Sequence, residues 1–274
     1  MGLIDTHIHV FIQGLKLAPL RRYAPDYEAT IETYQAEMKK NDITHAVVVQ
    51  PSFLGTDNSY MCQVLERYPN MLRGIAVVEP SITESELDKL QKSGVVGIRL
   101  NLEGQPLPRF DQGDWPRLLD AVRRRDWQIE INRAACDLPG LIDPLTDAGI
   151  NVVIDHFGRP DENLGVDDPG FRHLLKKGNS RRLWVKLSGA YRNGSDGRGF
   201  SWAPAAAELL LTHLGPDRLM WGSDWPHTRH ESYITVDLMR KAFEKWVPSI
   251  ADRVLVGKET AYNLFKFNRS PTHA

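Results

Sequence analysis

Short apolar runs recur along the chain and alternate with longer segments in which apolar positions repeat at helical spacing. Most of these runs are nearly continuous in apolar residues, as expected for strands that are buried on both faces. The first run contains Ile4–Val10, and the others lie at residues 43–50, 72–78, 95–102, 127–132, 151–156, 182–188 and 218–224. The pattern therefore predicts eight strands.

Helix signals fall between the predicted strands. A helical pattern begins near Glu28, Asp57 or Asn58 can cap a helix, and Thr83 with Glu86 forms a capping box. Later helices are predicted after residue 114, at 137–148, from near Pro204, near 232–247 and near 258–267. Strands and helices thus alternate through the whole chain.

This alternation predicts the fold class. Eight strands, each followed by a helix, with no linker between two halves, are typical of an α/β protein with a (β/α)8 TIM barrel, here a single domain over residues 1–274. A doubly wound open sheet is the alternative, but the Gly-x-Gly-x-x-Gly turn is missing between the first strand and the first helix. In a TIM barrel the active site lies at the C-terminal ends of the strands.

Four polar residues lie at predicted strand ends. His7 and His9 end the first strand, His156 ends the sixth and Asp224 ends the eighth. Strict alternation along a strand places Asp5 on the same face as the two histidines. The first and eighth strands are neighbours in a closed barrel, so we expect Asp224 to lie beside the histidine pair. Such a group can bind a metal ion or hydrogen-bond a substrate oxygen.

Composition narrows the partner class. The 34 Lys and Arg residues nearly balance the 35 Asp and Glu residues, with no basic stripe, which argues against nucleic acid and favours a small-molecule substrate. Cys62 and Cys136 form no Cys-x-x-Cys pair, as expected in a reducing compartment. No secretory leader and no membrane-spanning apolar run is found in the sequence, so we expect a cytoplasmic protein without a membrane partner. The oligomeric state stays open.

Three motifs carry a family resemblance. The runs at residues 5–9 (Asp-Thr-His-Ile-His), 154–160 (Ile-Asp-His-Phe-Gly-Arg-Pro) and 221–227 (Trp-Gly-Ser-Asp-Trp-Pro-His) resemble the amidohydrolase superfamily. Residues 22–25, 50–58 and 97–101 make the chain most similar to the 2-pyrone-4,6-dicarboxylate lactonase-like branch. The resemblance spans essentially the whole chain. It is more specific for the branch than for the substrate.

The resemblance implies both the activity and its residues. It implies a lactonase in which His7, His9, His156 and Asp224 form the catalytic centre and Asp224 deprotonates the attacking water. It also implies side chains that hold substrate carboxylates, which here are Arg99, Arg192, Tyr23 and Ser52, and Asn101 shares the face of its strand with Arg99. One departure is Gln105, which stands where the lactonase has a second arginine. The substrate is therefore expected to be an anionic lactone, either 2-pyrone-4,6-dicarboxylate-like or a sugar-acid lactone.

The metal content is a separate question. Two-metal members of the superfamily resemble one another in a bridging lysine on strand 4 and a histidine on strand 5. In this chain strand 4 offers Arg99 and Asn101, and strand 5 offers Glu130 and Asn132. A two-metal site is therefore not expected. One Zn²⁺ on His7, His9, His156 and Asp224 stays open. Because the lactonase branch hydrolyses its substrate without a metal, we favour no required cofactor, with the three histidines donating to the developing oxyanion.

Several alternatives share these residues. The same base and donors suit lactone isomerisation, and a bound metal would suit a mononuclear zinc hydrolase or decarboxylase. A non-catalytic ligand-binding barrel is the alternative outside enzymes. Arg99 can instead form a salt bridge with Glu130 in the wall of the barrel. We expect His230 at the surface and leave the position of His227 undecided. The aromatic residues Trp221, Trp225 and Phe157 are expected to be packing residues.

Overall fold

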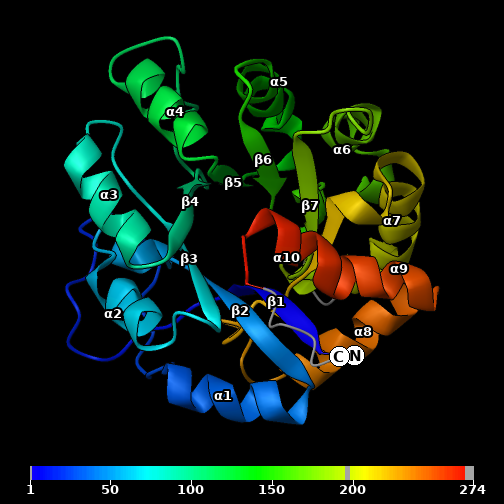
Figure 1. The fold of residues 1–274 in the computed structure, drawn as a ribbon. Helices are drawn as coiled ribbons and strands as arrows, with labels where there is room; N and C mark the ends of the chain where they lie inside the picture. Colours follow the sequence, from blue (N-terminus) through cyan, green and yellow to red (C-terminus); the bar gives the residue numbers. More distant parts are fainter. Residues whose placement is uncertain (1, 195–197, 269–274) are drawn as a thin grey trace, which may run out of the picture.

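The structure is a computed structural model, and it describes residues 2–194 and 198–268. Eight parallel strands follow one another in chain order around a single barrel (Figure 1). They are β1 (Leu3–Ile8), β2 (Ile43–Val49), β3 (Leu72–Ala76), β4 (Val95–Asn101), β5 (Gln128–Asn132), β6 (Asn151–Ile154), β7 (Leu183–Leu187) and β8 (Leu219–Trp221). The predicted (β/α)8 fold is confirmed, with every strand at its predicted place in the sequence.

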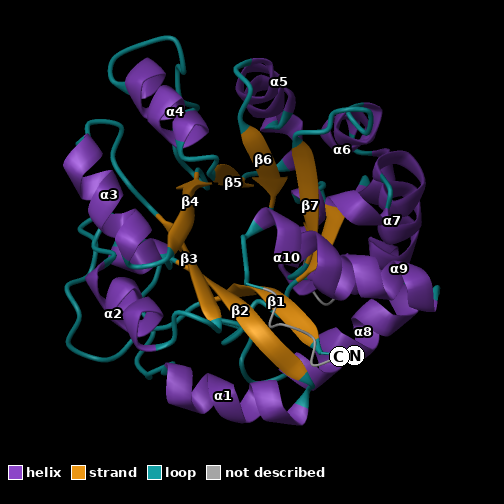
Figure 2. Cartoon of the chain, in the orientation of Figure 1, coloured by secondary structure: helices purple, strands orange, loops and turns teal. Residues whose placement is uncertain are grey.

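Helices surround the ring of strands (Figure 2). They are α1 (Ile31–Lys40), α2 (Ser59–Arg67), α3 (Glu84–Lys92), α4 (Trp115–Arg124), α5 (Pro139–Asp147), α6 (Pro169–Lys176), α7 (Arg198–Leu214), α8 (Val236–Trp246), α9 (Ile250–Val254) and α10 (Thr260–Leu264). The capping box of Thr83 and Glu86 forms at the start of α3. Helix α7 begins before the predicted position near Pro204 and contains that proline.

The barrel closes between its first and last strands. Ile8 forms a bridge with Trp225. The main-chain N–H of Asp224 donates to the carbonyl of His7 over 2.9 Å, and that of His9 donates to the carbonyl of Trp225 over 2.8 Å. The predicted neighbourhood of Asp224 and the histidine pair therefore follows from main-chain hydrogen bonds. At the other end of the barrel, where the strands begin, α10 lies across the opening (Figure 1).

Side chains alternate between the two faces of the strands. Ile98, Ile129 and Val185 point outwards and join the large core between the strands and the helices. Ile4, Val47, Val49, Ile75, Val153 and Met220 form a smaller apolar cluster inside the barrel, with Phe265 from the end of the chain. The inward positions above this cluster are charged or polar, which places the chemistry of the chain at the C-terminal ends of the strands.

Strand β1 departs from strict alternation. Its pairing with β2 has a register irregularity between Asp5 and Ile8. Asp5 accepts a hydrogen bond from Tyr34 of α1 over 2.6 Å, so it faces the helices and does not share a face with His7. The prediction that Asp5, His7 and His9 lie on one face was therefore wrong for Asp5, because the irregularity breaks the two-residue period.

Two further observations concern the chain as a whole. Cys62 and Cys136 are free thiols. Within residues 2–194 and 198–268, no helix has both the length and the apolar character needed to cross a membrane.

Candidate active site

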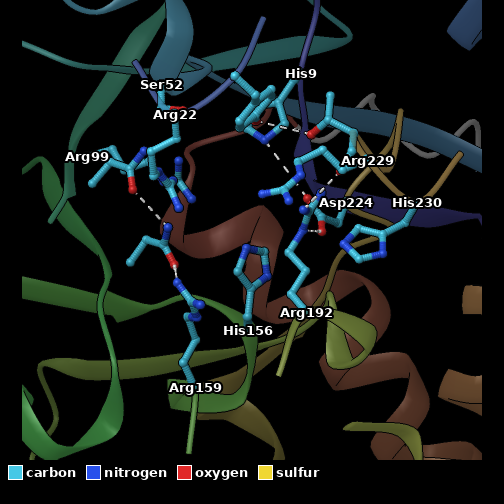
Figure 3. A pocket seen from close by; sticks show the side chains of 14 residues that line it. His9, Arg22, Ser52, Arg99, His156, Arg159, Arg192, Asp224, Arg229 and His230 are labelled. Carbon is cyan, nitrogen blue, oxygen red and sulfur yellow. Dashed lines mark hydrogen bonds and ion pairs between the residues drawn. The ribbon is translucent and has the colours of Figure 1, made fainter. Parts of the chain in front are cut away.

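A cavity of about 140 Å³ opens at the C-terminal ends of the strands (Figure 3). His9 after β1, Arg99 of β4, His156 after β6 and Asp224 after β8 all line it. His7 is fully buried directly beneath. Its ring centroid lies 5.0 Å from that of His9 and 4.8 Å from that of His156. The structure thus brings together the four residues that the sequence singled out.

Asp224 presents two different carboxylate oxygens. Oδ2 accepts hydrogen bonds from the Tyr191 hydroxyl over 2.7 Å and from Nε of Arg192. Oδ1 is buried, has no hydrogen-bond partner among the described residues, and lies 3.9 Å from Nε2 of both His7 and His9. Burial acts to raise the pKa of this carboxyl, but the charge and the hydrogen bond of Arg192 outweigh it and hold the pKa well below its usual range. Asp224 is therefore ionised, with one oxygen available.

His9 has a defined tautomer. Its Nδ1 lies 2.7 Å from the main-chain carbonyl of Val49, which can only accept a hydrogen bond. Burial, assisted by the charge of Arg99, lowers the pKa of His9 to about 4, so the ring is neutral. Its proton therefore lies on Nδ1, and Nε2 directs a lone pair towards Asp224. The expectation that all three histidines donate to an oxyanion does not fit this contact at His9.

His7 has charged neighbours at its other ring nitrogen. Nζ of Lys186 lies 3.2 Å from Nδ1 of His7, and Oδ1 of Asp155 lies 3.3 Å from the same atom. Burial and the charge of Lys186 hold the pKa of His7 well below its usual range. Nε2 of His7 is buried without a hydrogen-bond partner in the described part of the chain. Like Oδ1 of Asp224, it is a polar atom directed at the catalytic centre.

His156 completes the group from β6. Its Nδ1 lies 2.9 Å from Oγ of Ser188, and its ring points into the cavity (Figure 3). Burial lowers its pKa to about 3. Gly189 packs against this ring with φ +52°, and a Cβ at that position would lie 2.6 Å from Nδ1 of His156 and 2.9 Å from Oδ2 of Asp224. A glycine is therefore required where the chain passes between the two side chains.

Backbone strain also concentrates at this site. His156, Asp224 and Arg229 all have positive φ angles, at 52°, 64° and 72°, although none is a glycine. All three line the cavity. Such conformations cost free energy and persist where the surrounding structure enforces them, most often at functional sites. The strain marks the strand ends as the functional face.

The predicted substrate-binding residues also lie at the cavity. Tyr23, Ser52, Arg99, Asn101 and Arg192 line it. Arg99 donates to Oδ2 of Asp155 through Nε over 2.9 Å, with its NH2 nitrogen 2.8 Å from the same oxygen. Arg99 therefore forms the buried wall salt bridge that was the alternative, but with Asp155, because Glu130 pairs with Lys186. The predicted role of Arg99 in binding a substrate carboxylate stays a prediction. Inward-pointing residues of different strands meet across the barrel, which strand order alone does not reveal.

Arg192 binds within the site itself. Nε donates to Oδ2 of Asp224, and NH1 donates to the carbonyl of Thr228 over 3.3 Å. The hydroxyls of Tyr23 and Thr228 are 3.2 Å apart. Arg192 thus holds the carboxylate of Asp224 while still facing the cavity. Its predicted role in binding a substrate carboxylate stays a prediction.

Several cavity residues were not predicted. Arg22, Arg159, Arg229 and His230 line the cavity, so the expectation of a surface position for His230 was wrong. These residues lie on loops, where no periodicity indicates direction, although Arg22 and Arg159 stood inside the motifs that carried the resemblance. His227 is buried behind Asp224, with Nδ1 3.2 Å from the Tyr191 hydroxyl. Trp221, Trp225 and Phe157 are buried packing residues, as predicted.

The comparison with protein families decides the relationship. The model of the family described as amidohydrolase matches residues 4–267. The chain belongs to the amidohydrolase family. Among amidohydrolases, 4-sulfomuconolactone hydrolase from Rhizobium radiobacter is 34% identical over 230 residues, which is 83% of this chain and 76% of that protein. The 2-pyrone-4,6-dicarboxylate hydrolase from Comamonas testosteroni is 31% identical, over 91% of this chain and 84% of that protein.

Solved amidohydrolase structures agree with this relationship. A probable 2-pyrone-4,6-dicarboxylic acid hydrolase from Acinetobacter baumannii, with citric acid bound, has 40% identity and a TM-score of 0.93. The match covers 97% of this chain and 100% of that one. A more distant relative, D-galactarolactone isomerase from Agrobacterium fabrum, is 25% identical over 97% of this chain and 92% of that protein. A zinc-bound amidohydrolase from Burkholderia multivorans shares the fold. Its identity is 17% and its TM-score 0.81, and the match covers 98% of this chain and 100% of that one.

The side chains that could bind a metal ion in this amidohydrolase are those of the catalytic centre. Ligand atoms of His7, His9 and Asp224 lie within 4.8 Å of one another, as do those of His7, Asp155 and His156, so these groups could hold a metal ion. A metal-ligating histidine usually donates its other ring N–H to a carbonyl or carboxylate. His9 meets this condition through Val49, whereas Nδ1 of His7 lies 3.2 Å from the ammonium of Lys186 and 3.3 Å from Oδ1 of Asp155, and only the ammonium forms a hydrogen bond with it by geometry. The donor set fits a metal at His9 and Asp224 but not at His7.

Proposed function

We propose that this amidohydrolase opens the cyclic ester of an anionic lactone by hydrolysis, with Asp224 as the general base. The observation that carries the proposal is the free oxygen of Asp224. Oδ1 is buried, has no partner among the described residues, and lies 3.9 Å from both Nε2 atoms of His7 and His9 at the floor of the cavity. A carboxylate held ionised with one open oxygen suits proton abstraction from water.

The reaction uses atoms already at the site. Asp224 takes a proton from water while the water oxygen forms a bond to the lactone carbonyl carbon. His9 accepts a hydrogen bond from this water through Nε2, and His7 and His156 donate to the oxyanion that develops. The ring C–O bond then breaks, and the leaving oxygen receives the proton from Asp224. Preorganised donors of this kind commonly contribute ~10²–10³ in rate each.

The charge of the cavity supports an anionic substrate. Arginines at positions 22, 99, 159, 192 and 229 line it. Arg22 and Arg229 have no carboxylate at ion-pair distance within residues 2–194 and 198–268, so their charges are available to a ligand. Guanidinium groups match carboxylates and sulfonates by paired hydrogen bonds. The relatives named as hydrolases of a pyrone dicarboxylate and of a sulfomuconolactone support this substrate class.

We propose that the reaction needs no metal. The support lies in the chemistry of His7: Nδ1 accepts a hydrogen bond from the ammonium of Lys186 and forms none by geometry with the nearby carboxylate of Asp155, which leaves the proton on Nε2 and makes that atom unsuited to metal ligation. The free thiols of Cys62 and Cys136 support a cytoplasmic location.

Lactone isomerisation is the second candidate, and the relationship to D-galactarolactone isomerase favours it. In that reaction a hydroxyl of the substrate replaces water as the attacking group, and Asp224 serves as the base in the same way. The products separate the two reactions. Hydrolysis releases an open-chain acid, whereas isomerisation yields a second lactone of the same mass.

The test is an assay of the purified protein on 2-pyrone-4,6-dicarboxylate, 4-sulfomuconolactone and sugar-acid lactones, with products identified by mass spectrometry. Metal content is measured on the same sample, and each assay is repeated with a chelator. We expect an open-chain acid from at least one lactone and equal rates with and without chelator. Complete loss of activity on chelation would refute the metal-free mechanism. No turnover of any lactone would refute the function.

A further inference from the structure

A second charged cluster lies directly beneath the cavity, on the inward faces of β5, β6 and β7. Lys186 of β7, Glu130 of β5 and Asp155 after β6 are all fully buried. Nζ of Lys186 donates to Oε2 of Glu130 over 2.6 Å and lies 3.4 Å from Oδ1 of Asp155. Arg99 binds the other oxygen of Asp155, so two cations face two carboxylates. Buried charges are costly, and a hydrophobic barrel layer would avoid that cost.

This cluster contacts the catalytic centre at one atom. Nζ of Lys186 lies 3.2 Å from Nδ1 of His7, within hydrogen-bond geometry. Oδ1 of Asp155 lies at a similar distance, 3.3 Å, and its charge favours the protonated ring, but by geometry it has no hydrogen-bond partner among the described residues. An ammonium group can only donate. Nδ1 of His7 therefore accepts, and the proton of the neutral ring lies on Nε2.

His7 and His9 consequently have opposite tautomers. Nδ1 of His9 faces the carbonyl of Val49, which can only accept, so Nε2 of His9 carries a lone pair. Nε2 of His7 carries a proton. Both Nε2 atoms lie 3.9 Å from Oδ1 of Asp224. The site therefore offers two acceptors, His9 and Asp224, to the attacking water, and one donor, His7, to the carbonyl oxygen on which negative charge develops.

We infer that Lys186 is a positioning residue, which fixes the Nε2–H tautomer of His7 and so makes His7 a hydrogen-bond donor to the reacting oxygen rather than a metal ligand. The inference rests on the proposed function for the identity of that oxygen. It does not depend on that function for the tautomer, because the contacts of Lys186 and His7 are present in the protein without substrate.

The test measures the tautomer directly. Nitrogen-15 NMR of histidine-labelled protein distinguishes a protonated ring nitrogen from a bare one, and a His7→Asn variant assigns the signal. In the parent protein we expect Nε2 of His7 to be protonated and Nδ1 to be bare. A His7 signal with the proton on Nδ1 would overturn the inference, whatever the activity of the protein.

Two variants extend the test. Lys186→Met with Glu130→Gln removes the donor and keeps the cluster neutral, so that no uncompensated charge is buried. We expect the proton of His7 to move to Nδ1, towards Asp155, and kcat to fall by ~10²–10³ with a small change in KM. Glu130→Gln alone is the matched control, because it keeps the Lys186 side chain beside Nδ1 of His7 and should keep the Nε2–H tautomer. Urea unfolding of this variant measures the cost of leaving Lys186 without that carboxylate.

Zinc binding gives a readout that is independent of activity. Titration with zinc ions alone should show tighter binding in the double variant than in the parent, because Nε2 of His7 then offers a lone pair beside His9 and Asp224. An unchanged tautomer together with an unchanged kcat in the double variant would overturn the inference. Absence of lactone turnover in the parent would overturn the proposed function and leave the tautomer measurement unaffected.

Discussion

Replacing Gly189 with alanine tests whether the spacing between two predicted catalytic groups matters. Gly189 follows β7 and has φ +52°. An added Cβ would lie 2.6 Å from Nδ1 of His156 and 2.9 Å from Oδ2 of Asp224, whereas ordinary van der Waals contact begins at 3.4 Å. The methyl group must therefore displace the imidazole, the carboxylate or both.

The expected magnitude follows from these distances. The two contacts fall short of ordinary contact by about 0.8 Å and about 0.5 Å. A displacement near 1 Å in a catalytic group can cost ~100-fold in rate, so we expect kcat/KM to fall by roughly 10–100-fold. The left-handed backbone adds an energetic cost of about 1–2 kcal/mol for a residue with a Cβ. Activity and stability should therefore both decrease.

A matched control separates the two effects. Gly113 has φ +56°, and within the described residues no atom lies within 4 Å of a Cβ built there. Gly113→Ala should therefore lose similar stability without losing activity. The assay is kcat/KM for lactone hydrolysis, together with urea unfolding of both variants. Parent-like kcat/KM in Gly189→Ala, or an equal loss in both variants, would refute the reasoning.

Three further predictions concern the base, its neighbour Arg192 and the buried carboxylate of Asp5. Asp224→Asn removes the base, so kcat should fall by ~10²–10⁴ while calorimetry still detects substrate binding; parent-like kcat would contradict this role. A carboxylate base is active only above its pKa, and Arg192 keeps the pKa of Asp224 low. Arg192→Met should therefore raise the pKa of Asp224, so that kcat/KM begins to fall at a higher pH when the solution is acidified. An unmoved acid limb in the pH profile would exclude this effect. Tyr34→Phe removes the 2.6 Å hydrogen bond to buried Asp5 and should lower the free energy of unfolding by about 1–3 kcal/mol, with an unchanged urea midpoint as the contrary result.

The fold could be predicted because each buried strand is a short apolar run with helix signals on either side. The convergence of His7, His9, His156 and Asp224 followed from the same reasoning, since the C-terminal ends of barrel strands meet at one face. Position along a strand therefore carried enough information to locate the catalytic centre, although it did not give the roles of its members.

The roles of the individual site residues could not be predicted from the sequence, because they depend on contacts between residues that are far apart in the chain. Lys186 stands among apolar residues in β7, and nothing local indicates that it reaches Glu130 and His7 across the barrel. The tautomer of His9 depends on a carbonyl at the end of β2. Asp5 faces the helices because β1 has a register irregularity that its residue pattern does not reveal.

The main-chain hydrogen bonds that close the barrel have a consequence for how such enzymes diversify. His7 and Asp224, and likewise His9 and Trp225, are joined through backbone atoms, so the reacting groups keep their spacing when neighbouring side chains are exchanged. Arg22 and Arg229, in contrast, reach the cavity from the parts of the loops that follow these bonded residues, at residues 11–30 and 228–235. Mutations in those two segments can therefore change which lactone is accepted while the bond-breaking chemistry is inherited intact.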